Sequence, residues 1–206
     1  MTTHDLGHIH HFIPASDDDD AVLLMLHGTG GDENDLIPLA RMLRPGAAIL
    51  SPRGNVLEHG MPRFFRRLAE GVFDLEDLAA RTDELAAFID GASERYGIDR
   101  SKLVAVGFSN GANIAASLML RRPGSLHRAV LLSPMVPFEP TQTVSLAGTR
   151  VFIGGGRSDP IAPPAQAEHL AQLLRNGGAD VTTYFHTGGH ALTNDEVVAA
   201  TKWISN

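Results

Sequence analysis

Apolar residues gather along the chain in short runs that are rich in Val, Ile and Leu and are bounded by Gly, Pro, Ser or Asp. Runs of about four to eight apolar residues are typical of strands buried on both faces of a parallel sheet. The pattern therefore predicts buried strands over residues 22–26, 47–50, 103–108, 129–132, 150–153 and 181–185.

A different periodicity separates most of these runs. Between the second and third, apolar or small residues recur every three or four positions and so share one face of a helix that we expect to end near Gly97. They are Leu75, Leu78, Thr82, Leu85 and Ile89. Similar patterns predict further helices over residues 110–120, 164–176 and 194–204.

Alternation of strands and helices predicts an α/β fold with a mostly parallel central sheet and helices on both faces. Residues 8–13 are expected to add an antiparallel edge strand at the start. A chain of 206 residues can bury a full core but is too short for two domains of ordinary size. We therefore expect one domain that comprises residues 1–206.

Composition narrows the class of protein. Hydrophobic residues make up 43% of the chain and charged residues 20%, which is ordinary for a globular protein. No apolar run approaches the roughly 20 residues that span a bilayer, and the N-terminus lacks the pattern of a secretory signal. We expect no membrane span and a cytoplasmic location. The absence of cysteine excludes disulfides and thiolate chemistry.

Charge argues against two kinds of partner. The net charge is −7, and the arginine pairs are set among acidic residues, so nucleic acid is not expected to bind. Residues 17–20 are four consecutive aspartates, which predict a solvated turn between strands rather than a calcium loop. The four N-terminal histidines, His4, His8, His10 and His11, do not indicate a metal site. The adjacent His10 and His11 would point to opposite faces of a strand.

Candidate chemistry begins where the strand over residues 103–108 meets a helical stretch. The residues there are Gly107, Phe108, Ser109, Asn110 and Gly111, a GxSxG elbow in its required context. Glycines are needed because the turn is so tight that side chains would collide, and the serine is held exposed on strained backbone. Ser109 is therefore the candidate nucleophile.

A serine hydroxyl needs a base, which this kind of fold places on a loop after the last strand. His190 lies there, after residues 181–185, and Gly188 and Gly189 allow the backbone to turn the imidazole back toward the sheet. His186 is the rival, but it lacks preceding glycines at the strand's end and is interpreted as structural.

The base in turn needs an acid that fixes its tautomer. Asp159 follows the strand over residues 150–153 and completes the chain order Ser, Asp, His. Pro160 and Pro163 stiffen its loop. Asp180 precedes its strand and would lie at the wrong end of the sheet.

The small-residue loop after the first buried strand predicts an oxyanion hole. Its residues, His27 to Gly31, let the backbone approach a substrate carbonyl closely. We assign the donors to the backbone N–H groups of Thr29 and Asn110. A phosphate-binding interpretation fails, because the loop matches neither GxGxxG nor the Walker pattern and no lysine follows.

Together these segments resemble the small phospholipase/carboxylesterase family of α/β-hydrolases, and in particular its bacterial branch related to hydroquinone-associated esterases. The resemblance runs from about Val22 to the C-terminus and includes LHGTGGDENDL, LVAVGFSNGANIAASLML, GGGRSDPIAPP and GGHALTNDE. It implies a serine esterase with no metal or organic cofactor. Relatives of acyl-protein thioesterases usually have Gln where this chain has Asn110, which argues against a protein-depalmitoylating role.

Three hypotheses follow for the function. The first is a cofactor-free esterase of short to medium acyl chains with a small-molecule substrate. The second is a thioesterase or lactone hydrolase with the same triad, and the third is a non-catalytic binding protein, against which the complete triad argues. The sequence leaves a homodimer open.

Residues 52–73 form too long a connection for an ordinary crossover, and we expect a flap over the site with only a minimal cap. Four apolar residues are candidates for the substrate pocket, two in this segment and two after the strand over residues 129–132: Phe64, Phe65, Met135 and Val136. Aromatic residues in such a loop also serve simply to fill core, and the sequence does not separate these two roles.

Overall fold

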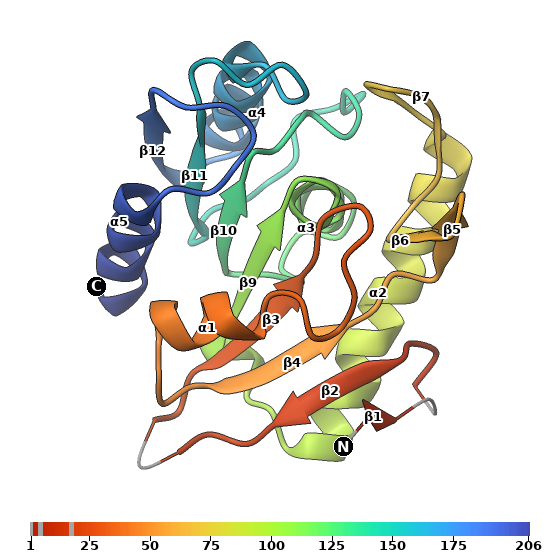
Figure 1. Ribbon diagram of the computed structural model, residues 1–206, viewed down its shortest axis with the longest axis vertical. Coiled ribbons are helices and arrows are strands. Elements are labelled where there is room, and N and C mark those ends of the chain that lie inside the picture. Colours follow the sequence, from red (N-terminus) through yellow and green to blue (C-terminus); the bar gives the residue numbers. More distant parts are fainter. Residues whose placement is uncertain (1, 4–5, 17–18) are drawn as a thin grey trace.

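A computed structural model describes residues 2–3, 6–16 and 19–206. Within this part of the chain, eight strands form one sheet in the order β1-β2-β4-β3-β9-β10-β11-β12 (Figure 1). The strands are β1 (Thr2–Thr3), β2 (His10–Ile13), β3 (Val22–Leu26), β4 (Ala48–Pro52), β9 (Leu103–Phe108), β10 (Arg128–Leu132), β11 (Arg150–Gly156) and β12 (Asp180–His186).

The sheet is parallel from β4 through β12, and only its first edge is antiparallel. Strand β2 pairs antiparallel with both β1 and β4, with His10 opposite Pro52. Because all strands from β4 to β12 point the same way, their carboxyl ends meet at one edge. The predicted fold class is confirmed. The antiparallel strand expected over residues 8–13 is β2, and the two-residue strand β1 lies outside it at the edge.

Helices cover both faces of this sheet (Figure 1). On one face α2 (Leu75–Tyr96), α3 (Asn110–Arg121) and α4 (Pro164–Asn176) pack over the larger apolar core. On the other face α1 (Ile37–Leu43) and α5 (Asn194–Ser205) cover a second core that includes Trp203. Helix α2 begins at Asp74, whose side chain accepts from the Asp77 amide, and ends at Gly97 in the left-handed conformation.

Helix α1 was not predicted from the sequence. Its signal is present but short: Leu39, Ala40 and Leu43 are buried, and a proline occupies its first turn. Seven residues give fewer than two full turns of periodicity, which is too little to stand out from a loop. A 3₁₀ turn at Arg100–Lys102 was likewise not anticipated.

Residues 52–73 fold into two small antiparallel hairpins. The first comprises β5 (Val56–Glu58) and β6 (Met61–Arg63), and the second comprises β7 (Arg67–Ala69) and β8 (Val72–Phe73). They stand beside the carboxyl end of the sheet, next to α2 (Figure 1).

The acidic run and the first histidines are only partly described. Asp17, Asp18 and His4 lie outside the described residues. Asp19 accepts hydrogen bonds from Arg44 and from the Ala21 amide. Asp20 forms an ion pair with Lys102, whose Nζ lies 2.7 Å from Asp20 Oδ2.

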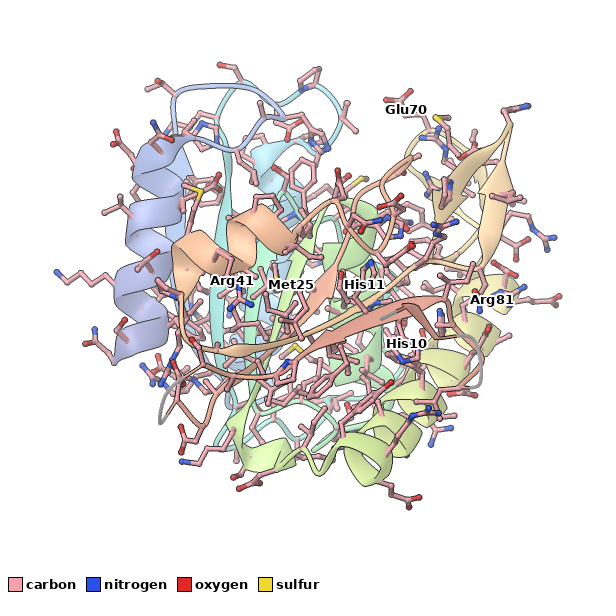
Figure 2. The ribbon with its side chains drawn as sticks, turned by 60° about the horizontal axis from the view of Figure 1, so that its bottom comes forward. His10, His11, Met25, Arg41, Glu70 and Arg81 are labelled. Atoms are coloured by element: carbon pink, nitrogen blue, oxygen red, sulfur yellow. The ribbon has the colours of Figure 1, made fainter. Side chains whose placement is uncertain are left out.

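His8 and His10 both pack against Phe88, and His11 points away from them. His10 is buried against Phe88 and Tyr96 of α2, whereas His11 contacts Asn34 on the other side of β2 (Figure 2). Within the described residues, no three His, Asp or Glu side chains converge on a metal-sized site. No helix in this part of the chain is both long and apolar enough to cross a bilayer.

Candidate active site

The GxSxG elbow joins β9 to α3 as the sequence predicts. Ser109 has φ 52° and ψ −113°, a positive-φ conformation outside the allowed regions that costs energy for any residue with a side chain. A Cβ at Gly107 would come within 2.6 Å of the Ala112 amide, and one at Gly111 would overlap the carbonyl oxygen of Leu26. Both glycines are therefore required by close backbone packing around the serine.

The structure brings Ser109, His190 and Asp159 into one hydrogen-bonded chain, although they lie up to 81 residues apart. His190 Nε2 is 2.9 Å from Ser109 Oγ, and His190 Nδ1 is 2.7 Å from Asp159 Oδ2. Because a carboxylate can only accept, Nδ1 carries the imidazole proton and Nε2 is left to accept from the serine hydroxyl. This is the tautomer that a general base needs.

Asp159 is buried and held from both sides. Its second oxygen, Oδ1, accepts from the backbone amides of Ile161 at 2.8 Å and Ala162 at 2.9 Å. Burial by itself would raise the pKa of Asp159, but hydrogen bonds from the Ala162 amide and from His190 outweigh it, so this pKa lies below its ordinary value. The carboxyl is therefore ionised and fixed in direction at neutral pH.

The amides assigned to the oxyanion hole are free. Thr29 and Asn110 both line the cavity that contains Ser109 and His190. Neither of the two amides donates to an acceptor among the described residues, whereas the amide of Ser109 donates to the Leu132 carbonyl at 2.8 Å. Asn110 is also the first residue of α3, where the helix dipole favours negative charge.

Two side chains that were not predicted as part of the site, Arg63 and His27, hold the loop that carries Thr29 through hydrogen bonds. Arg63 donates from Nη1 to Thr29 Oγ1 at 2.6 Å. His27 is buried, and its Nε2 accepts from the Gly54 amide at 2.9 Å, so its Nδ1–H donates to the Gly28 carbonyl at 2.7 Å. Burial lowers the pKa of His27 and keeps the ring neutral, as this pair of bonds requires.

Asn110 also has a role beyond its backbone. Its side-chain Oδ1 accepts from the amide of Phe64 at 2.7 Å, which joins the nucleophile elbow to the segment of residues 52–73. The Asn110 side chain is buried, and its Nδ2 has no acceptor in the described chain.

Beside Ser109 lies a cavity of about 330 Å³. Residues of the 52–73 segment form much of its wall, and the elbow between β9 and α3, with the loops after β3, β10, β11 and β12, forms the rest. The lining comprises Thr29, Arg63, Arg67, Glu70, Gly71, Phe73, Phe108, Ser109, Asn110, Asn113, Met135, Ile161 and His190.

The prediction of the pocket residues needs correction. Met135 lines the cavity, but Phe64 and Phe65 do not, because both are buried in the larger apolar core. Val136 also packs against this core rather than on the cavity wall. The aromatic cavity residues are instead Phe73 and Phe108, the second 5.2 Å from the His190 ring.

His186 lies apart from the serine. It ends β12, is buried, and has its Nε2 3.5 Å from Oε2 of the fully buried Glu196 on α5. Its Nδ1 accepts from the Gly188 amide, in the loop that leads to His190. Asp180 is the first residue of β12 and so lies at the opposite end of the sheet from the serine.

Comparisons with known proteins agree with this architecture. Residues 8–206 match the model of the family described as Phospholipase/Carboxylesterase. MhqD of Bacillus subtilis (strain 168) is 50% identical over 184 residues, which are 89% of this chain and 92% of MhqD.

Solved structures give the same result. The carboxylesterase of Bacillus cereus is 51% identical with a TM-score of 0.94, over 98% of this chain and 95% of that one. The carboxylesterase of Mesorhizobium loti is 32% identical with a TM-score of 0.95, over 100% of this chain and 98% of that one. The chain thus belongs to the phospholipase/carboxylesterase family of enzymes with the α/β-hydrolase fold.

Proposed function

We propose that this enzyme hydrolyses carboxylic esters of short to medium acyl chain through an acyl-enzyme intermediate on Ser109. The observation that carries the proposal is the unbroken chain Ser109 Oγ, His190, Asp159 beside two unengaged amides. A side chain placed only for stability has no need of a strained backbone that exposes its hydroxyl to a cavity.

In the first half of the reaction, Ser109 Oγ attacks the ester carbonyl carbon while His190 Nε2 takes the hydroxyl proton. Negative charge develops on the carbonyl oxygen, where the amides of Thr29 and Asn110 can donate to it. Asp159 stabilises the imidazolium. Collapse of the resulting tetrahedral intermediate breaks the bond to the alcohol oxygen, and the alcohol leaves with the proton from His190.

Water completes the cycle. It attacks the acyl-enzyme, His190 takes one of its protons, and the second collapse returns that proton to Ser109 as the carboxylic acid departs. Every proton is returned, so these residues require no cofactor. The same steps would serve thioesters and lactones, and a substrate panel must include both.

The cavity supports a small substrate. A volume of about 330 Å³ lies at the low end for small-molecule sites, and the two hairpins are the only cap over it in the described chain. Each added methylene improves binding by about 0.8 kcal/mol only while apolar wall remains to bury it. We therefore expect acyl groups of about two to eight carbons to react best, without a lipid interface.

A serine-directed fluorophosphonate tests the proposal. We expect it to label the parent protein at Ser109 and to leave Ser109→Ala unlabelled, with turnover of p-nitrophenyl acetate reduced on the order of 10⁴-fold or more. A folded Ser109→Ala protein with near-parent turnover would show that another residue is the nucleophile. Absence of labelling in the parent would favour a binding protein.

Chain-length preference is measured by kcat/KM for p-nitrophenyl esters, with and without detergent micelles. A steep rise out to long chains, or activity that begins only above the micelle threshold, would contradict the short-ester proposal. A cytoplasmic location also stays a prediction, to be tested by cell fractionation.

A further inference from the structure

Two arginines on the flap segment face the same cavity as the nucleophile. Arg63 on β6 and Arg67 on β7 both line it, and Arg63 is only 3% exposed. In the described chain, Glu58 is the single carboxylate within ion-pair distance of either: 3.3 Å from Arg63 Nη1 and 2.9 Å from Arg67 Nε. One negative charge therefore serves two guanidinium groups.

Donor atoms remain free on both side chains. Arg63 uses Nε for the Phe65 carbonyl and Nη1 for Thr29, and its Nη2 donates to no acceptor in the described chain. The Nη2 atom keeps some solvent exposure, and Arg63 is one of the residues that line the cavity. Among the described residues, Arg67 donates hydrogen bonds only from its Nε, to Glu58.

Asn113 of α3 adds a third donor to the wall. Its Oδ1 accepts from the Met135 amide at 2.7 Å, which orients the amide and leaves Nδ2 without a protein acceptor in the described chain. Asn113 is buried and lines the cavity. Three side chains on this wall therefore offer donors that no protein group in the described chain accepts.

Negative groups near the cavity do not offset these donors. Glu58 is already shared between the two arginines. Glu70 also lines the cavity, but its side chain is exposed at the outer rim of the molecule (Figure 2). An exposed carboxylate is strongly screened by water and salt. Burial and the neighbouring Arg67 charge both lower the pKa of Arg63, so a further anion nearby would stabilise this guanidinium.

We propose that the cavity selects esters that carry a free, negatively charged carboxylate in addition to the ester group. Arg63 and Arg67 bind this carboxylate with help from Asn113. Planar guanidinium groups hold carboxylates through paired charge-assisted hydrogen bonds. Phe73, Met135 and Ile161 supply apolar wall for a short carbon chain between the carboxylate and the ester. The substrate class is thus half-esters of short diacids, or short hydroxy acids acylated on the hydroxyl group, and it rests on the proposed esterase function.

Matched ester pairs test the selectivity, followed by acid release in a pH-stat. Monoethyl succinate against ethyl butyrate places the carboxylate on the acyl side, and acetoxyacetate against propyl acetate places it on the alcohol side. We expect kcat/KM to favour the anionic member at least about tenfold in one pair, and the preference to weaken with added NaCl. Equal or better hydrolysis of both neutral esters would overturn the proposal while leaving the esterase function intact.

A binding measurement does not depend on turnover. Calorimetry with Ser109→Ala should show binding of the anionic ester of the preferred pair and at least about tenfold weaker binding of its neutral partner. If the parent hydrolyses no ester but this binding persists, the esterase function fails and the carboxylate site stands. If neither anionic ester binds more tightly than its neutral partner, the carboxylate site fails.

Adjacent arginines provide a matched pair of variants. Arg67→Gln should reduce the preference for the anionic ester about tenfold, because it removes one cavity guanidinium. Arg66→Gln should keep the preference, because Arg66 does not line the cavity and pairs with Asp74 at 2.7 Å. Thermal unfolding checks that both variants fold. A preference unchanged in folded Arg67→Gln, or lost equally in both variants, would overturn the assignment.

Discussion

The side chain of Asn110 accepts a hydrogen bond from the backbone amide of Phe64, 46 residues earlier in the chain. The residue that follows the nucleophile therefore has two roles. Its amide is a candidate oxyanion donor, and its carboxamide fastens the hairpin segment over the site. A movement of that segment would be transmitted directly to the elbow.

Asn110→Ala should destabilise the protein by about 1–3 kcal/mol, because it leaves the buried Phe64 amide without an acceptor. Turnover should also fall, since the flap loses its link to the elbow, although the backbone donor remains. Urea denaturation gives the stability, and kcat with p-nitrophenyl acetate gives the activity. Parent-like values of both would mean that the link is not needed.

Gly111→Ala should prevent folding or destabilise the protein by more than about 3 kcal/mol, because its Cβ would overlap the Leu26 carbonyl. Gly155→Ala is the control. There the nearest atom to a Cβ is 3.9 Å away and the backbone is not left-handed, so the change should stay within about 1 kcal/mol. Similar losses in the two variants, measured by urea denaturation, would contradict the packing argument.

Sequence analysis was strongest where the signal is local. Ser109 with its flanking glycines is one contiguous elbow, and the strand ends place His190 and Asp159 at the same edge of the sheet as the serine. Their catalytic roles stay predictions, but their convergence in space follows from topology alone. The strand boundaries shift by three residues at most: β4 shifts by one and two, and β11 extends three residues beyond its predicted end.

Contacts between distant segments were not predictable in the same way. No local pattern relates Arg63 to Thr29, which lie 34 residues apart, or His27 to Gly54. Phe65 was predicted to line the pocket because it occurs in a polar loop. It instead packs edge-on against Phe73 and beneath the Arg63 guanidinium, and so forms part of the core. Such partners depend on how the two hairpins fold back, and hydrophobic periodicity carries no information about that.

The two candidate histidines should behave oppositely when replaced. His190→Ala should lower kcat by roughly 10³-fold or more with little effect on stability, because the base of the serine is lost. His186→Ala should keep most activity but lower stability, since it removes the imidazole that lies 3.5 Å from the buried Glu196 carboxylate. Kinetics and urea denaturation of both variants separate these outcomes. The reverse ranking would show that His186 is the base.

Glu196 should make the stability depend on pH in a direction that can be stated in advance. Its carboxylate is fully buried, and this burial outweighs the opposing effect of the Thr193 backbone and raises the pKa of Glu196 from 4.5 to about 7. Between those values the folded protein holds a proton that the unfolded chain releases. The contribution of protonated Glu196 to the free energy of unfolding is therefore fully present below pH 4.5 and is lost as pH rises through about 7.

Glu196→Gln removes this titration and isolates its effect. The free energy of unfolding of the variant minus that of the parent should grow by about 3 kcal/mol between pH 4.5 and pH 7.5, since a shift of one pKa unit corresponds to roughly 1.4 kcal/mol. Burial lowers the pKa values of His8 and His27, so these residues destabilise both proteins toward acid and cancel in the difference. Urea denaturation at several pH values across this range measures it. A difference that stays constant with pH, or that shrinks as pH rises, would mean that Glu196 is already ionised in the folded protein.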